Sequence, residues 1–132
     1  MSALDQNCSL LLVDDDQEFL EILVRRFVRR GVQAMGESNP QAALDAANRQ
    51  KFDVAILDRS LPGQDGLELM QQLKECQPEL RVILLSGHGD KQAIAQARGC
   101  GAFDYLVKPC SLADLEAAVS SAYQSAVGVG PQ

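Results

Sequence analysis

Charged side chains follow three short apolar runs of the sequence. Asp14 and Asp15 follow the first run, Asp58 follows the second, and Lys108 follows the third. The runs, at residues 10–13, 54–57 and 105–107, have the length of buried strands, and turn residues come after each of them. Because the carboxyl ends of parallel strands meet at one edge of a sheet, where ligands bind, we expect these charges to share one pocket.

A pocket that gathers carboxylates around one ammonium group favours a divalent cation. Carboxylates that lie close together repel one another and resist ionisation unless a cation joins them. Oxygen ligands with open coordination positions suit Mg²⁺, which keeps several waters and accepts phosphate oxygens. The charges around Asp58 and Lys108 therefore predict a Mg²⁺ site that serves phosphoryl chemistry.

The composition is that of one globular domain. The chain has 132 residues, 46% hydrophobic and 23% charged, which is enough for one core and too few for two. We expect a single domain over residues 1–132, with its core at about 8–126 and both termini frayed. The net charge of −6 argues against direct nucleic-acid binding by this domain, and the apolar runs are too short to cross a membrane.

The cysteines indicate a reducing compartment. No CxxC pair occurs, and the single histidine does not complete a zinc-like pattern. We therefore predict reduced cysteines in a cytoplasmic protein, in preference to disulfides or a metal site. The residues concerned are Cys8, Cys76, Cys100 and Cys110.

Strand and helix patterns alternate along the chain. The expected strands are residues 9–13, 32–37, 54–57, 81–85 and 103–107, and the expected helices are residues 17–30, 40–49, 67–76, 90–98 and 112–126. Such alternation predicts an α/β fold, with a doubly wound parallel sheet between two layers of helices. The third, fourth and fifth strands are the most continuously apolar and are expected to be central, and residues 61–66 are expected to form a loop.

Four motifs, each after its own strand, carry the chemistry. They are Leu11-Leu12-Val13-Asp14-Asp15-Asp16, then Asp58 with Pro62, Asp65 and Gly66, then Ser86-Gly87, then Tyr105-Leu106-Val107-Lys108-Pro109. Together and in this order they resemble the receiver domain of two-component response regulators, over nearly the whole chain. The resemblance implies a CheY-like, flavodoxin-type fold with a five-stranded parallel sheet in the order 2-1-3-4-5 and five helices.

The resemblance also implies the roles of the charged residues. Asp58 corresponds to the phosphoacceptor, with an acyl phosphate as the covalent product. Asp15 and Asp58 would bind Mg²⁺ directly, together with the backbone carbonyl of Ser60. Asp14 would join through a water molecule. Lys108 would pair with Asp58 before phosphorylation and with a phosphoryl oxygen afterwards.

The residues around the predicted pocket correspond to the family's switch. The Ser86 hydroxyl would donate a hydrogen bond to the phosphoryl group, and Tyr105 would change rotamer in response. The alternative for Tyr105 is a half-buried side chain with its hydroxyl at the surface. Gly87 would leave room for the phosphoryl group, and Pro109 is expected to follow a cis peptide bond. His88 is expected to flank the site as a solvated loop residue.

The predicted function is a phosphorylation-dependent signalling switch. A sensor histidine kinase or a histidine phosphotransfer protein would phosphorylate Asp58. The surface of the fourth helix, fifth strand and fifth helix would then bind a downstream target, an output domain or a second copy. The protein would catalyse only its own phosphorylation and dephosphorylation.

Other functions fit the sequence less well. A phosphohydrolase of the haloacid dehalogenase type needs an acid/base aspartate two residues after the nucleophile, where this chain has Ser60. A receiver that has lost its chemistry would lack the acidic pair or the lysine, and both are present. A nucleotide-binding fold would have a glycine-rich loop after the first strand, where this chain has acidic residues.

The expected first helix begins and ends with charge. Asp16 is expected to cap its amino end, in preference to a metal role. Near its other end, arginines gather on one side: Arg25, Arg26, Arg29 and Arg30. We expect a solvated face with an ion pair from Glu21 to Arg25. A docking surface for an acidic phosphotransfer partner is the alternative.

Overall fold

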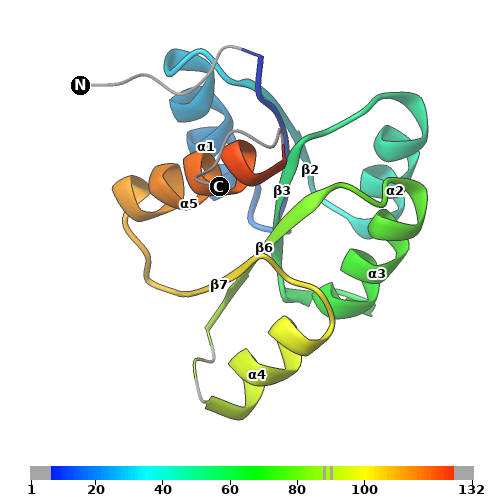
Figure 1. Cartoon of the computed structure of the whole chain (residues 1–132). Helices are drawn as coiled ribbons and strands as arrows, with labels where there is room; N and C mark the ends of the chain where they lie inside the picture. The colour runs from blue at the N-terminus through cyan, green and yellow to red at the C-terminus, as the bar shows by residue number, and fades with distance from the viewer. Residues whose placement is uncertain (1–6, 88, 90, 127–132) are drawn as a thin grey trace.

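A parallel sheet of five strands forms the centre of the molecule. The computed structural model describes residues 7–87, 89 and 91–126. The strands lie in the order β2-β1-β3-β6-β7 (Figure 1). Numbered without the short hairpin described below, this is the predicted order 2-1-3-4-5. The strands are β1 (Ser9–Val13), β2 (Gln33–Glu37), β3 (Val54–Asp58), β6 (Arg81–Ser86) and β7 (Asp104–Val107).

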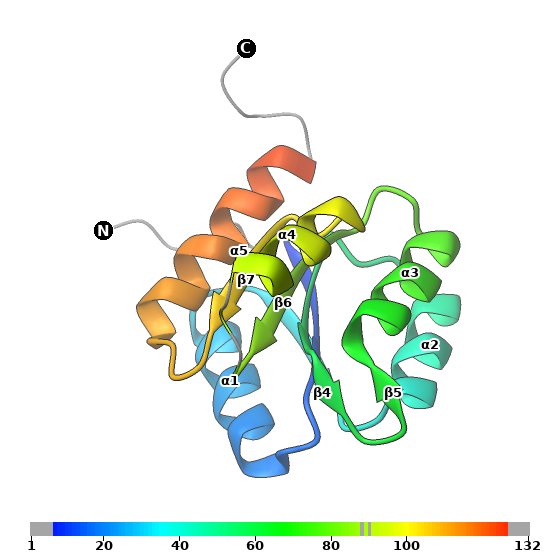
Figure 2. The same ribbon diagram turned by 90° about the horizontal axis from the view of Figure 1, so that it is seen from below.

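Helices cover both faces of this sheet, as the alternating pattern predicts. Helices α1 (Gln17–Arg29) and α5 (Leu112–Ala126) lie on one face. Helices α2 (Pro40–Arg49), α3 (Gly66–Cys76) and α4 (Lys91–Gly99) lie on the other (Figures 1 and 2). Each face therefore has its own apolar core. No helix among the described residues has the length and hydropathy that a membrane span needs.

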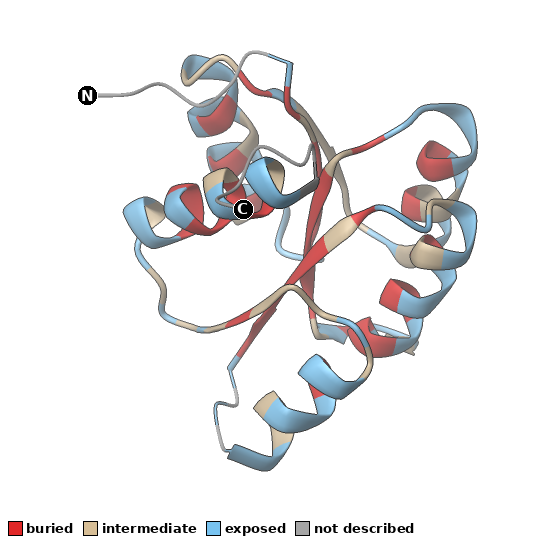
Figure 3. Ribbon diagram, in the orientation of Figure 1, coloured by how far each residue is buried: buried red, intermediate tan, exposed pale blue. Residues whose placement is uncertain are grey.

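Alternating strand residues supply the two cores, because successive side chains of a strand point to opposite faces. In β3, Val54 and Ile56 belong to the core under α1 and α5, whereas Ala55 and Leu57 belong to the core under α2, α3 and α4. Every residue of β3 is buried (Figure 3). Asp58, the last residue of β3, therefore lies at the end of a strand that is buried along its whole length.

The helices begin at the capping residues that the sequence indicates. Asp16 accepts a hydrogen bond from the backbone N–H of Phe19 at 3.1 Å, which confirms its capping role. Asn39 caps α2 at 2.9 Å, and the Ser111 hydroxyl caps α5 at 3.0 Å. These side chains satisfy N–H groups that have no partner within their helix. Helix α1 ends at Arg29, and Gly31 then takes the left-handed conformation with φ of 89°.

A short hairpin replaces the loop that we expect at residues 61–66. Strand β4 (Ser60–Leu61) pairs antiparallel with β5 (Gln64–Asp65), and Gly63 turns the chain with φ of 80°. Two-residue strands are too short to show an alternating pattern, which is why the sequence indicates only turn residues here. Helix α3 then begins at Gly66, one residue earlier than expected, with Asp65 as its cap.

The expectation that the fifth strand is central is wrong. Strand β7 lies at the edge of the sheet, next to β6 alone. Only Tyr105 of its four residues is buried, and Val107 at its end is 41% exposed. Apolar composition did not separate the edge from the centre, because the side chains of β7 are covered by α4 and α5 rather than by strands on both sides.

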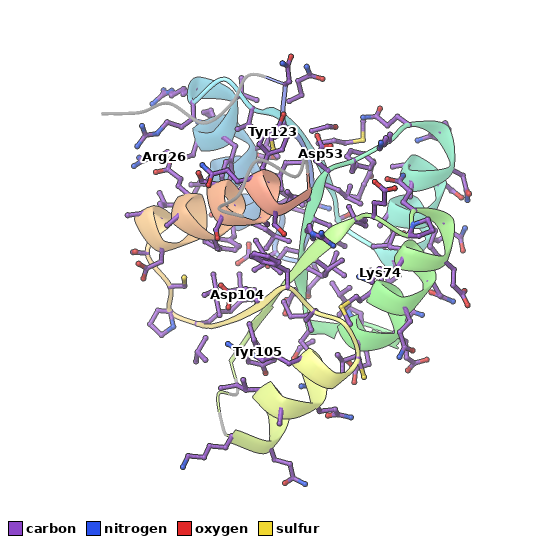
Figure 4. The ribbon with its side chains drawn as sticks, viewed as in Figure 1. Arg26, Asp53, Lys74, Asp104, Tyr105 and Tyr123 are labelled. Atoms are coloured by element: carbon purple, nitrogen blue, oxygen red, sulfur yellow. The ribbon has the colours of Figure 1, made fainter. Side chains whose placement is uncertain are left out.

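The arginines of α1 are not simply solvated. Arg30 and Arg26 place their Nε atoms 2.9 and 3.3 Å from Oε2 of Glu116 on α5. Arg26 is labelled in Figure 4, on the side of α1 that faces α5. Glu116 is 9% exposed, so this cluster joins the two helices across a largely buried carboxylate. The expectation of a solvated face is therefore wrong for Arg26 and Arg30, which contact Glu116.

Candidate functional site

The predicted charges meet at one edge of the sheet. Strands β1 and β3 are parallel, with Val13 opposite Leu57, so the residues that follow them lie at the same end. Asp14 comes directly after β1, and Asp58 is the last residue of β3. Lys108 comes directly after β7 and reaches across to both. Parallel pairing thus brings together residues that are far apart in the sequence.

Lys108 stands between the two buried carboxylates. Its Nζ atom lies 3.3 Å from Oδ2 of Asp58 and 3.5 Å from Oδ2 of Asp14. The predicted ion pair with Asp58 is therefore present, and Asp14 shares it. Asp14 is 4% exposed and Asp58 is 5% exposed.

The second oxygen of each carboxylate accepts a backbone hydrogen bond. The N–H of Ser60 donates to Oδ1 of Asp58 at 3.0 Å, and the N–H of Asp16 donates to Oδ1 of Asp14 at 2.9 Å. These bonds fix the orientation of both carboxylates. One oxygen of each is held by the chain, and the other faces the lysine.

Burial and neighbouring charged groups have opposing effects on the pKa values of Asp14 and Lys108. Burial raises the pKa of Asp14 above its ordinary value, and the nearby Asp58 adds to this, although the Asp16 N–H and Lys108 oppose it. For Lys108, burial alone would lower the pKa, but the carboxylates of Asp14 and Asp58 together raise it. The ammonium group is thus held charged, while the Asp14 carboxylate is not fully compensated.

The three acidic residues fit a divalent metal ion. One oxygen each from Asp14, Asp15 and Asp58 lies within 4.8 Å of the others. Asp15 is exposed, so the cluster opens to solvent on one side. A set of carboxylate oxygens with an open side leaves coordination positions for water and phosphate, which is the ligand set that Mg²⁺ prefers. The under-compensated charge of Asp14 is a further reason for a cation to bind here.

Of the two predicted switch residues, one lies beside this cluster and the other lies in the core under α4. Ser86 ends β6, is 1% exposed, and accepts a hydrogen bond from the backbone N–H of Lys108 at 2.7 Å through its carbonyl. Tyr105 is 6% exposed, so it is more deeply buried than the half-buried alternative, in the core under α4 (Figure 4).

The remaining predicted residues have mixed outcomes. The Lys108–Pro109 peptide bond is cis, as the resemblance implies. A Cβ atom at Gly87 would meet no atom of the described residues within 4 Å, its chain neighbours aside, so close packing at that atom does not require glycine. His88 and the chain termini lie outside the described residues, so the predictions for them stay untested.

The structure adds contacts that sequence patterns do not reveal. The Phe19 ring lies 5.7 Å from Nζ of Lys108, within the range of a cation–π interaction. Arg59, the neighbour of Asp58, contacts Asp65, which caps α3, and Gln96 on α4. Both residues could be suspected only from their closeness in sequence to the acidic motifs, because their partners lie on other elements.

Comparison with known proteins agrees with this geometry. Residues 10–120 match the family model of the response regulator receiver domain. The chain is 43% identical over 108 residues to the transcriptional activator protein PfeR of Pseudomonas aeruginosa, covering 82% of this chain and 35% of PfeR. It is 29% identical over 113 residues to sporulation initiation phosphotransferase F of Bacillus subtilis, covering 86% of this chain and 91% of that protein.

A solved structure shares both the fold and part of the sequence. A response regulator protein from Burkholderia pseudomallei, solved with a phosphorylated aspartic acid, a calcium ion and citrate, superposes with a TM-score of 0.81 at 30% identity. The match covers 92% of this chain and 72% of that one. PfeR is much longer than this chain, which spans about a third of it.

Proposed function

This chain belongs to the family of response regulator receiver domains, and from that premise we propose that Asp58 is its phosphoacceptor. The observation that carries the proposal is the buried Asp58 carboxylate at the end of β3, with Oδ2 facing Lys108 and Oδ1 held by the Ser60 N–H. A carboxylate oxygen of Asp58 attacks the phosphorus of the donor. The donor leaves with the electron pair of the broken bond, and an acyl phosphate forms.

Charge compensation is the main requirement of this reaction. The phosphoryl group brings a charge of about −1.5 to −2 into a cluster that is already acidic. Mg²⁺, held by Asp15, Asp58 and the Ser60 carbonyl, with Asp14 joining through water, would neutralise charge on the transferring oxygens. Lys108, whose ammonium group is held charged, exchanges its contact with Asp58 for one with a phosphoryl oxygen.

The new charge is converted into a change of surface. Ser86 lies next to Lys108 at the end of β6, and its hydroxyl donates to the phosphoryl group. Tyr105 then repacks in the core beneath α4, which alters the surface of α4, β7 and α5. In a complex with beryllofluoride, a mimic of the phosphoryl group, amide exchange should change most across residues 90–105. Changes confined to α1 would contradict this route.

The partners follow from the chemistry of a receiver. A sensor histidine kinase or a phosphotransfer protein supplies the phosphohistidine, and the altered surface binds a target, an output domain or a second copy. Nucleic acid is not a direct partner of this acidic domain. We place the protein in the cytoplasm, because none of its four cysteines forms a disulfide and a reducing compartment keeps thiols reduced. Catalysis is limited to its own phosphorylation and dephosphorylation.

Labelling with a small phosphodonor tests the acceptor. The protein incubated with Mg²⁺ and acetyl phosphate should gain one phosphoryl group, stable in acid and labile in base, which intact mass spectrometry detects. Asp58→Asn should show no comparable adduct, because the amide is not a nucleophile. Asp45→Asn makes the same change at an exposed residue of α2 and should label like the wild type. Equal labelling of Asp58→Asn would overturn the assignment.

A further inference from the structure

The backbone of Arg59 is held on both sides directly after the acceptor residue. Its N–H donates to the carbonyl of Leu85 on β6 at 2.9 Å, and its carbonyl accepts from the N–H of Gly66 at 2.8 Å. Arg59 is covalently joined to Asp58. Any displacement of the acceptor end of β3 therefore displaces Arg59 as well.

Close packing against α3 makes this loop stiff. A Cβ atom at Gly66 would lie 2.6 Å from the carbonyl oxygen of Asp58 and 2.7 Å from Cα of Arg59. Only glycine fits at that distance, since real Cβ atoms do not approach backbone atoms so closely. The first turn of α3 thus lies directly on the backbone of the acceptor loop.

The side chain of Arg59 contacts the residue that caps α3 and a residue of α4. Its Nη2 donates to Oε1 of Gln96 on α4 at 3.0 Å. Its Nε lies 3.6 Å from Oδ1 of Asp65, the carboxylate that caps α3 by accepting from the Leu67 N–H at 2.9 Å. The Arg59 side chain is 18% exposed and the Asp65 side chain 43%, so the arginine is largely covered while its contacts with Asp65 and Gln96 lie at the surface.

Helix α4 depends on such contacts because little of it is buried. Within α4 only Ala97 is buried, whereas α3 buries five residues. Most of α4 appears as exposed surface in Figure 3, and Figure 1 shows it standing out from the rest of the fold. A helix with one buried residue is held weakly by its core, so a polar contact forms a large share of its attachment.

We propose that Arg59 is a positioning residue that ties α4 to the acceptor loop and transmits movement of that loop to α4. This coupling passes through the hydrogen bond between Arg59 and Gln96 of α4. It is separate from the route through Ser86 and Tyr105 in the core. The inference rests on the proposed role of Asp58 as acceptor. It adds a chain-specific connection to the output surface, made by a residue that acts through its neighbour rather than on the reacting atoms.

Amide hydrogen exchange of the whole, unphosphorylated protein tests the tether. Arg59→Gln and Gln96→Ala should each speed exchange within α4 by roughly two- to tenfold, the range expected for loss of one hydrogen bond. The double variant should add little to either single change, because both remove the same contact. Arg98→Gln removes an exposed arginine from α4 itself and serves as the matched control.

The same variants test whether the tether transmits the signal. Beryllofluoride binding should change α4 exchange less in Arg59→Gln than in the wild type. The inference is overturned if Arg59→Gln alters α4 no more than Arg98→Gln does, if the two changes add fully in the double variant, or if the beryllofluoride response is undiminished. Acetyl phosphate labelling of wild type and Arg59→Gln separates this failure from failure of the proposed function. If Asp58 is not the acceptor, the expected adduct is missing in the wild type as well. If only the tether is wrong, both proteins are labelled.

Discussion

Two charge clusters in the described part of the chain contain buried carboxylates, and they differ in how well the charge of those carboxylates is compensated. At the carboxyl edge of the sheet, Lys108 lies beside both Asp14 and Asp58, and the pKa of Asp14 is raised because burial is the largest influence on it. Between α1 and α5, Arg26 and Arg30 both hold Glu116. Burial would raise the pKa of Glu116, but hydrogen bonds from Arg30 and Arg26 lower it.

The two clusters differ in their ratio of carboxylates to cations. The edge cluster has more carboxylates than cations, whereas the interhelical cluster has more cations than carboxylates. A buried carboxylate without full compensation costs stability and attracts a cation. A carboxylate held by two guanidinium groups is saturated and stabilises the contact of its helices. The first arrangement suits the proposed binding of Mg²⁺ and a phosphoryl group, and the second suits a structural contact.

Metal binding should show the largest contrast between the two clusters. Asp15→Asn should weaken Mg²⁺ binding at least about tenfold, because it removes a proposed direct ligand and even indirect partners of a metal contribute 10- to 100-fold. Calorimetric titration with Mg²⁺ measures the affinity. Asp16→Asn, a change in the neighbouring exposed cap, and Glu116→Gln should leave it nearly unchanged. Equal affinity of Asp15→Asn and wild type would remove Asp15 from the site.

Loss of the saturated carboxylate should destabilise the fold. Glu116→Gln leaves Arg26 and Arg30 without their anion, and the free energy of unfolding at pH 7 should fall by about 1–2 kcal/mol. Urea denaturation measures the change, with the exposed Glu75→Gln on α3 as control. Because the pKa of Glu116 is lowered in the folded state, its contribution is complete above about pH 4.3 and is lost as the pH falls through the folded-state pKa.

The opposite effect is expected at the edge cluster, and it should be the smallest. Asp14→Asn should raise the free energy of unfolding of the metal-free protein by about 1 kcal/mol at pH 7, since it removes an under-compensated buried charge. The pKa of Asp14 is raised, so this gain should be absent below about pH 3.9 and grow as the pH rises through the folded-state pKa.

Excess Mg²⁺ shows whether Asp14→Asn stabilises the protein by removing an uncompensated charge or by a change in packing. Mg²⁺ should stabilise the wild type more than Asp14→Asn. The increase in the free energy of unfolding caused by the substitution should therefore be smaller with the metal than without it. Urea denaturation with and without Mg²⁺ measures this, and Asp45→Asn is the control. A loss of stability in metal-free Asp14→Asn would mean that Lys108 already compensates the carboxylate, and the contrast with Glu116 would fail.

Much of the site could be predicted because it depends on local patterns. The apolar runs before Asp14, Asp58 and Lys108 have strand length, and parallel pairing brings their ends to one edge. The capping role of Asp16 follows from its place before an amphipathic helix. The two-residue strands around Gly63 were missed because they are too short for any periodicity, and the edge position of β7 was missed because apolar content alone does not count neighbouring strands.

The sequence by itself determined the order of strands and helices, the residues at each strand end and the excess of acid at the predicted site. Only the tertiary structure decided that Asp14 shares Lys108 with Asp58, that Arg59 reaches Gln96 on α4, and that Glu116 meets the arginines of α1. The physical reason is range. Strand and helix patterns arise from neighbours along the chain. The sign of a pKa shift depends on which charges lie within a few ångströms and how much water is excluded, and both are set when distant elements pack.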